Sequence, residues 1–348
     1  MQVTPKAALF ARALLMAGLV ALAGMAPAAA QEAEERSYLL ATAGTGGTYY
    51  PVGVAIATLV SVRVQPEHGI AMSAITSAGS GENIRLLAGD QAQFAILQGL
   101  WGAYARNGSG PVEPLGPQEN LRSITMLWSN VEHFTIRRDY AETGTADDLL
   151  GMEGRGFAIG ARNSGTEGSN RHLLAGLGIE DPDSFFDLAY IGYSPSVDAF
   201  MNGNIDALNT AAGAPVGAMT RLQAAAGDEA VILEFTEDQL ARANGGLELW
   251  TFHVLEPGTY PGQDEAIRTI AQPNFLAVNA AVDEDAVYRI TRAIYENLPF
   301  LHNIHQATRA MAPERALTGL PLPLHPGALR YYEEAGLEIP DRLRPEAE

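Results

Sequence analysis

Between two apolar segments lies the stretch Ala41-Thr42-Ala43-Gly44-Thr45-Gly46-Gly47-Thr48-Tyr49-Tyr50-Pro51. The run Tyr38–Leu40 before it predicts a strand, and the apolar periodicity of residues 52–64 predicts a helix. Glycines permit a tight turn and a close approach of a ligand to the backbone. We expect Thr48 to cap the helix and Pro51 to lie in its first turn. The free N–H groups there suit an anion, although the stretch taken alone favours an ordinary connection.

Three further stretches repeat this pattern of strand, small polar turn and helix, one in the first half of the chain and two in the second. These turns comprise residues 77–83, 161–169 and 209–215. In open α/β sheets such turns lie at the carboxyl ends of strands, where ligands bind. Each helix N-terminus carries about half a positive charge and unsatisfied N–H donors. Four such helix N-termini, in two domains that face each other, therefore predict a cleft for a small anion.

Side chains in these turns predict how the helices begin. Ser80 and Asn83 resemble a loose capping box, with Asn in place of the usual Glu or Gln. In the third turn, Ser164, Thr166 and Ser169 are all candidate caps. We therefore expect hydroxyl groups to line the predicted cleft.

Residues 1–30 are predicted to be an export signal and not part of the fold. Lys6 and Arg12 form a basic start, residues 13–23 an apolar run, and Ala28-Ala29-Ala30 a cleavage site near Ala30. The apolar run is too short for a comfortable membrane span. The chain contains no cysteine, which excludes a lipid-anchored N-terminal cysteine. The prediction is a periplasmic protein whose signal is removed.

The charge balance restricts the partners. The formal net charge is −19, and removal of Lys6 and Arg12 with the signal leaves 20 basic against 41 acidic residues, or −21. Such a charge argues against nucleic acid and anionic membrane surfaces, because the long-range field repels both. An anionic ligand must then be held by local dipoles and at most one arginine. Arg162, in the third turn, is either that group or a surface charge.

Motifs for catalysis and cofactors are missing from the sequence. It contains no phosphate-binding P-loop, no G-x-S-x-G elbow and no H-E-x-x-H pattern. The stretch Gly44–Tyr49 lacks the third glycine of a dinucleotide fingerprint, and His302 and His305 have no acidic partner nearby. A dispersed catalytic triad leaves no such motif, so it stays an alternative, although nothing nominates a nucleophile. We predict no enzymatic activity, no metal and no cofactor, and we expect Tyr49 to form an aromatic wall of the cleft.

In its motifs the chain resembles the TAXI family, the extracytoplasmic solute receptors of tripartite ATP-independent periplasmic (TRAP) transporters. The matching stretches occur in order over 38–340 and include residues 44–51, 77–83, 160–167, 203–207, 211–215, 258–263 and 325–332. The resemblance implies an α/β, two-lobed type II periplasmic binding protein fold with the ligand cleft between the lobes. Lobe 1 would comprise residues 31–131, lobe 2 residues 132–269, and residues 270–348 would return to lobe 1 with C-terminal helices.

The resemblance also implies a function. The receptor would capture a small organic acid or amino acid, such as glutamate or a dicarboxylate, and deliver it to a TRAP membrane permease driven by an ion gradient. The ligand contacts carried over by position are Thr45, Gly47, Thr48, Tyr49, Ser80, Asn83, Gln98, Asn163, Ser164, Thr166, Ala212 and Gly213. Relatives often have an acid shortly after the glutamine, where this chain reads Gln98-Gly99-Leu100, which shifts the expectation toward acids without an amine. A periplasmic sensor and a periplasmic enzyme of the same fold are the alternatives.

Overall fold

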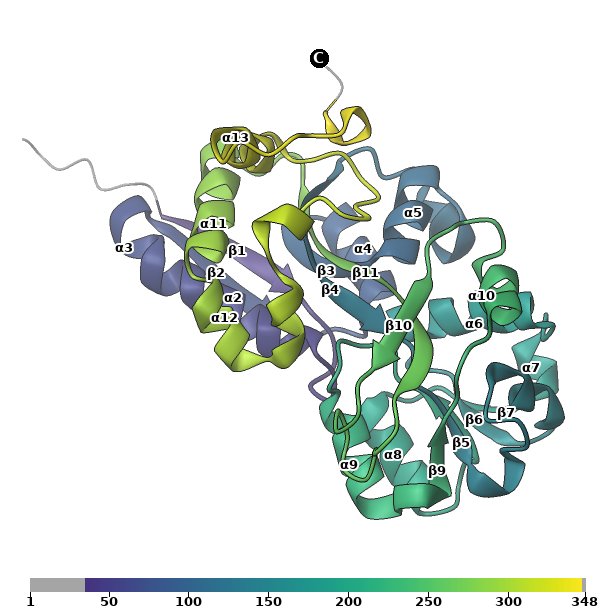
Figure 1. The fold of residues 1–348 in the computed structure, drawn as a ribbon. Coiled ribbons are helices and arrows are strands. Elements are labelled where there is room, and N and C mark those ends of the chain that lie inside the picture. Colours follow the sequence, from purple (N-terminus) through teal and green to yellow (C-terminus); the bar gives the residue numbers. More distant parts are fainter. Residues whose placement is uncertain (1–34, 346–348) are drawn as a thin grey trace, which may run out of the picture. The chain divides into compact units, whose positions relative to one another are not determined.

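Two β-sheets organise residues 35–345, the part of the chain that the computed structural model describes (Figure 1). The predicted export signal lies outside these residues. The first sheet has the strand order β10-β11-β3-β1-β2, with β4 also paired to β11; the second has the order β7-β6-β8-β5-β9. The strands are β1 Arg36–Ala41, β2 Ile70–Ile75, β3 Phe94–Gln98, β4 Leu121–Val131, β5 Phe134–Arg137, β6 Gly156–Ala158, β7 Asp187–Ala189, β8 Ala207–Asn209, β9 Ala230–Ile232, β10 Thr251–Leu255 and β11 Ile267–Asn279.

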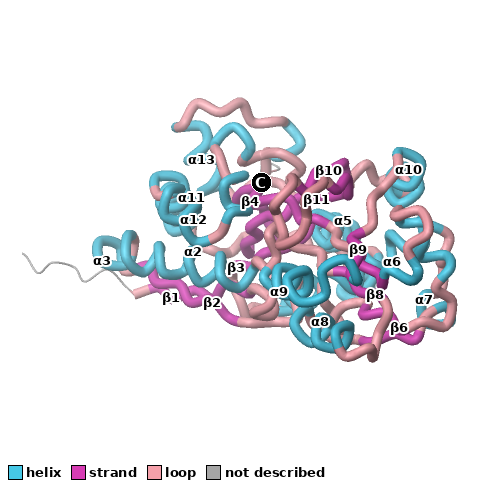
Figure 2. Tube along the Cα trace, turned by 60° about the horizontal axis from the view of Figure 1, so that its bottom comes forward, coloured by secondary structure: helices cyan, strands magenta, loops and turns pink. Residues whose placement is uncertain are grey.

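Helices surround both sheets, as Figure 2 shows along the backbone trace. The α-helices are α2 Tyr49–Arg63, α3 Gln65–His68, α4 Ser80–Ala88, α5 Gly99–Asn107, α6 Gly165–Leu177, α7 Pro182–Phe185, α8 Tyr193–Met201, α9 Gly217–Ala226, α10 Glu237–Asn244, α11 Glu284–Glu296, α12 Leu298–Ile304 and α13 Pro326–Glu334. Within residues 35–345 no helix has both the length and the apolar character needed to cross a membrane.

Parallel strands in the first sheet bring successive turns to one edge. Strand β1 pairs in parallel with both β2 and β3, and Ala41 at its end lies opposite Ile75 and Ala95. Leu40 and Phe94 on these strands are fully buried, as expected for a parallel strand covered by helices on both faces. The turns into α2 and α4 and the end of β3 therefore meet at the same edge of the sheet.

The second sheet repeats this arrangement in smaller form. Strand β6 pairs in parallel with β7 and β8. One apolar cluster includes Phe134, Phe157 and Leu173 on the face covered by α6, and another includes Phe200, Leu208 and Met219 on the face covered by α8 and α9 (Figure 1). Both faces are thus buried, and the turns into α6 and α8 lie at one edge.

Two segments connect the lobes. Strand β4 leads into β5 through Glu132 and His133, and the long strand β11 begins beside the second lobe and ends beside β3. Ile270 near the start of β11 belongs to the same apolar cluster as Phe134 of the second lobe, whereas Phe275 belongs to the core of the first lobe. Strand β10, which the predicted range 132–269 assigns to lobe 2, pairs with β11 in the first sheet, because β11 extends across both lobes.

Candidate functional site

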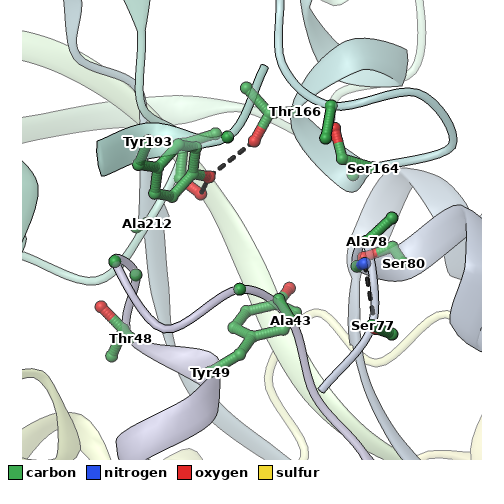
Figure 3. Close-up of a pocket in the computed structure, with 18 of the residues that line it drawn as sticks. Ala43, Thr48, Tyr49, Ser77, Ala78, Ser80, Ser164, Thr166, Tyr193 and Ala212 are labelled. Carbon is green, nitrogen blue, oxygen red and sulfur yellow. Dashed lines mark hydrogen bonds between the residues drawn. The ribbon is translucent and has the colours of Figure 1, made fainter. Parts of the chain in front are cut away.

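A cavity lies between the turns of the two lobes, with about 630 Å³ of empty space including the part open to solvent (Figure 3). The first lobe contributes the turns before α2 and α4 and the end of β3, and the second lobe contributes the turns before α6 and α8 and the segment after β8. The lining residues are Ala43, Gly44, Gly46–Tyr49, Ser77–Ser80, Gln98, Ala161, Ser164–Thr166, Gly192, Tyr193, Ala211 and Ala212.

Four helix N-termini border this cavity, those of α2, α4, α6 and α8. The first N–H groups of a helix have no intrahelical acceptor, and the helix dipole makes this end positive. The turn 209–215 follows strand β8 and leads into helix α9, as predicted, but the start of that helix does not line this cavity. Helix α9 begins at Gly217, which lines a neighbouring surface hollow, while Ala211 and Ala212 reach the cavity without a helix start.

The capping predictions were right for one helix. Ser164 caps α6, where its hydroxyl accepts from the Glu167 N–H at 3.0 Å. Thr48 does not cap α2: its backbone is already helical (φ −85°, ψ −28°), and its hydroxyl donates instead to the Gly213 carbonyl at 2.7 Å. The capping box is wrong as well, because Gly79 precedes the helix with φ +122° and Ser80 is already its first residue.

Ser80 and Asn83 position the strand ends instead. The Ser80 hydroxyl accepts from the Gln98 N–H at 3.1 Å. The Asn83 amide donates to the carbonyls of Thr42 (2.8 Å) and Ile96 (3.0 Å). These bonds tie α4 to the ends of β1 and β3, which places the first two turns and Gln98 side by side.

Eight of the thirteen residues predicted as ligand contacts line the cavity: Gly47, Thr48, Tyr49, Ser80, Gln98, Ser164, Thr166 and Ala212. Of the other five, Thr45 lines the neighbouring hollow, Asn83 is buried behind the turn, and Gly213 accepts the Thr48 hydrogen bond.

Arg162 and Asn163 complete the set. Both are exposed and lie outside the cavity lining. The Arg162 guanidinium stacks 3.6 Å above the centre of the Tyr190 ring, which favours the surface-charge alternative for this residue. The Asn163 carbonyl accepts from the Glu82 N–H at 3.0 Å and so joins the two lobes.

Sequence reasoning missed Tyr193, which lines the cavity at the start of α8 (Figure 3). Its hydroxyl lies 2.6 Å from the Thr166 hydroxyl and 2.7 Å from the Ala211 carbonyl. Gly192 followed by Pro195 resembles the start of α2, where glycine precedes tyrosine and Pro51. The preceding strand β7 spans only Asp187–Ala189, and so short a strand gives little periodic signal.

None of the residues that line the cavity carries a formal charge. Burial raises the pKa of the Tyr49 and Tyr193 hydroxyls, so both stay neutral. Within the described part of the chain, no His, Asp, Glu or Cys lines the cavity to act as a base toward its hydroxyls. Among residues 35–345, no group of three or more metal-ligating side chains could hold an ion. The site offers hydrogen bonds and helix dipoles.

Ionisable groups lie behind the cavity, at the β4–β5 connection. Glu132 is fully buried, and its carboxylate accepts from the Asn209 amide (2.8 Å) and the Trp250 indole (3.1 Å). Burial raises the pKa of Glu132 to about 7, although these bonds oppose the shift. Burial lowers the pKa of His133 to about 4, and its ring bonds Tyr260 and the Thr210 carbonyl. Both side chains are therefore largely uncharged in mildly acidic solution.

Contacts across the cleft close the cavity on two sides. On one side the Trp101 indole donates to the Gly165 carbonyl at 3.1 Å, and a Cβ at Gly168 would lie 2.5 Å from its ring. On the other side Thr48 donates to the Gly213 carbonyl. These are contacts of a closed pair of lobes.

The two sheets, the strands that connect the lobes and the cavity between them give the chain a two-lobed α/β fold with a cleft between the lobes, as predicted. A protein of Bordetella bronchiseptica RB50 is similar in structure, with a TM-score of 0.51 and 15% identity over 91% of this chain and 87% of that one. The sequence profile of the NMT1-like family matches residues 40–336, and the chain belongs to this family.

Two other structures are similar at lower scores. The alkanesulfonate-binding protein SsuA from Xanthomonas axonopodis pv. citri, bound to MOPS, has a TM-score of 0.46 and 11% identity over 86% of this chain and 91% of that one. A TRAP periplasmic solute binding protein from Roseobacter denitrificans, with bound β-D-glucuronate, has a TM-score of 0.43 and 11% identity over 86% of each chain.

Proposed function

We propose that this protein is a periplasmic solute receptor of the TAXI type, which captures a small organic acid in its interlobe cavity and delivers it to a TRAP permease. One observation carries the proposal: four helix N-termini, two from each lobe, converge on a cavity without charged side chains. Backbone N–H groups and helix dipoles at such ends favour an anion.

The net charge of the molecule limits which anions can bind in the cavity. The chain carries a net charge of −19, so its long-range field repels anions. Because no arginine or lysine among the described residues lines the cavity, the attraction must come from the helix ends at close range. Such ends act within about one turn of the helix. The site therefore suits one or two carboxylates held directly against the turns, and a large polyanion does not fit this description.

Closure explains how binding can be signalled to a permease. The cavity draws its lining from both lobes, so a bound ligand stabilises the closed arrangement through contacts on both sides. The β4–β5 connection and strand β11 are the segments about which the lobes would move. Export, a cleaved signal near Ala30 and release of the ligand to the permease complete the proposal.

Thermal unfolding of the chain without residues 1–30 tests the binding step. Mono- and dicarboxylates, amino acids, a sulfonate buffer and a hexuronate are each added at rising concentration. A ligand at 100 times its Kd should stabilise the protein by about 2.7 kcal/mol. A carboxylate that raises the melting temperature supports the proposal, and binding of sulfonates alone overturns the ligand class.

Transport is tested separately. The receptor is combined with its TRAP permease in proteoliposomes, and uptake of the identified acid is measured with an imposed ion gradient. Uptake that requires both the receptor and the gradient supports the proposal. Binding without any receptor-dependent uptake would leave the receptor as a sensor and contradict the transport role.

A further inference from the structure

Two hydroxyl protons in the second-lobe wall of the cavity, those of Thr166 and Tyr193, are already engaged. The Tyr193 hydroxyl lies 2.7 Å from the Ala211 carbonyl, which can only accept, so Tyr193 donates there. Tyr193 has no second proton, and its 2.6 Å contact with Thr166 must therefore be donated by Thr166 (Figure 3). Thr166 is 3% exposed, and its hydroxyl has only lone pairs left for a ligand.

Three hydroxyls of the first-lobe wall show the same pattern. The Tyr49 hydroxyl donates to the Asn274 side-chain oxygen at 2.5 Å, and the Thr48 hydroxyl donates to the Gly213 carbonyl at 2.7 Å. The single proton of Ser77 faces the Asn83 side-chain oxygen at 2.6 Å. These three hydroxyls also have only lone pairs left. Ser80 of this wall and Ser164 of the second lobe differ, because their oxygens accept the Gln98 and Glu167 N–H groups and their protons stay available.

Gln98 adds a buried acceptor between the walls. Its side chain is 2% exposed, and its Oε1 has no hydrogen-bond partner among the described residues. Gln98 lies against the start of α6, where a Cβ at Gly165 would be 2.8 Å from this oxygen. A buried acceptor without a partner is costly, so a ligand group that donates to it gains affinity.

We infer that the ligand carries a hydrogen-bond donor, a hydroxyl or an ammonium group, beside its carboxylate, and that Gln98 and Thr166 recognise it. The inference rests on the proposed function, which assigns the carboxylate to the helix N-termini. An oxo acid would direct its own lone pairs at these acceptors, and an unsubstituted acid would leave Gln98 without a partner. Sites that hydrogen-bond a substrate group discriminate strongly against analogues without it.

Calorimetric titration with acids of one carbon skeleton tests the inference. The three-carbon set is lactate, alanine, pyruvate and propionate, and the four-carbon set is malate, aspartate and succinate. The hydroxy or the amino acid should bind at least tenfold more tightly than the oxo and unsubstituted acids, and the tighter of the two identifies the donor. Equal or tighter binding of pyruvate, propionate or succinate overturns the inference while leaving a carboxylate receptor. If no acid in these sets or the wider panel binds, the proposed function fails with it.

Substitutions test whether Gln98 and Thr166 recognise the donor group of the ligand. Gln98→Met and Thr166→Val should each lower the affinity for the donor-bearing acid about tenfold and change that for the unsubstituted acid less than twofold. Thr166→Ser should restore the preference. Thr58→Val, the same chemical change on the exposed face of α2, should alter neither affinity. An equal loss for both acids in the Gln98 and Thr166 variants, with unchanged melting temperatures, would show a general contact and overturn the inference.

Discussion

The β4–β5 connection and the cavity in front of it are built from opposite kinds of polar group. At the connection, Glu132 and His133 are ionisable, fully buried and bonded to protein partners. In the cavity the groups are uncharged, and some of them, such as Gln98, have no protein partner. A polar group with all its partners stabilises a fold, whereas one without a partner is available to a ligand. The connection should therefore govern stability and its pH dependence, and the cavity should govern affinity.

Replacing Glu132 with alanine should have the largest effect, a loss of about 4 kcal/mol in the free energy of unfolding. The change leaves one N–H of the Asn209 amide and the N–H of the Trp250 indole buried without an acceptor, each costing about 1–3 kcal/mol, while the other Asn209 N–H keeps its bond to Asn170. Urea denaturation of the ligand-free protein measures it. Glu119→Ala at an exposed site is the control and should change stability by less than about 0.5 kcal/mol. If the Glu132 variant loses less than about 1 kcal/mol in the free energy of unfolding, the β4–β5 connection does not govern stability as we expect.

The pH dependence separates Glu132 from His133, because their pKa shifts act in opposite directions. The pKa of Glu132 rises from 4.5 to about 7, so between these values the folded state binds a proton that the unfolded state lacks, and stability falls as pH rises. The pKa of His133 falls from 6.5 to about 4, so there the unfolded state binds the extra proton, and stability rises with pH. Over pH 4.5–6.5 the two contributions oppose each other.

Single variants should reveal each contribution. Relative to the unchanged protein, Glu132→Gln should gain about 3 kcal/mol of stability between pH 4.5 and 7, since one pKa unit corresponds to about 1.4 kcal/mol. His133→Gln should lose about 3 kcal/mol relative to the unchanged protein between pH 4 and 6.5. Urea denaturation at each pH gives both differences, and surface carboxylates cancel in them. Parallel pH profiles for all three proteins would contradict the assignment.

Gly168→Ala addresses the closed cleft and should weaken ligand binding by about 2 kcal/mol. The new Cβ would lie 2.5 Å from the Trp101 ring, so the lobes could not close without displacement, and such overpacking costs about 1–3 kcal/mol. The ligand-free protein should keep its stability, because alanine suits a helix better than glycine by about 1 kcal/mol. Calorimetry with the identified acid measures the loss. Gly151→Ala, which meets nothing within 4 Å, is the control.

The sequence predicts the local elements around the cavity better than the contacts between distant segments. The stretch 41–51 predicts a strand, a turn and a helix because glycine, threonine and an apolar period are local signals, and β1 and α2 follow it. The hydrogen-bond partners of Thr48 and Tyr193 lie in distant segments, and no local pattern predicts such partners. The Arg162 side chain points toward the Tyr190 ring, which only the tertiary structure brings beside it.

Thr48→Val has the smallest expected effect and tests the corrected role of this residue. Its hydroxyl joins α2 to the Gly213 carbonyl of the other lobe, so the variant should lose about 1 kcal/mol of ligand affinity and keep its ligand-free stability. Ser164→Ala is the comparison, because Ser164 caps α6 within one lobe and its loss should cost about 1 kcal/mol of ligand-free stability. Urea denaturation and calorimetry on both variants separate the two quantities. If Thr48→Val lowers ligand-free stability as much as Ser164→Ala does, Thr48 caps its helix after all, and the contact between the lobes is not its main role.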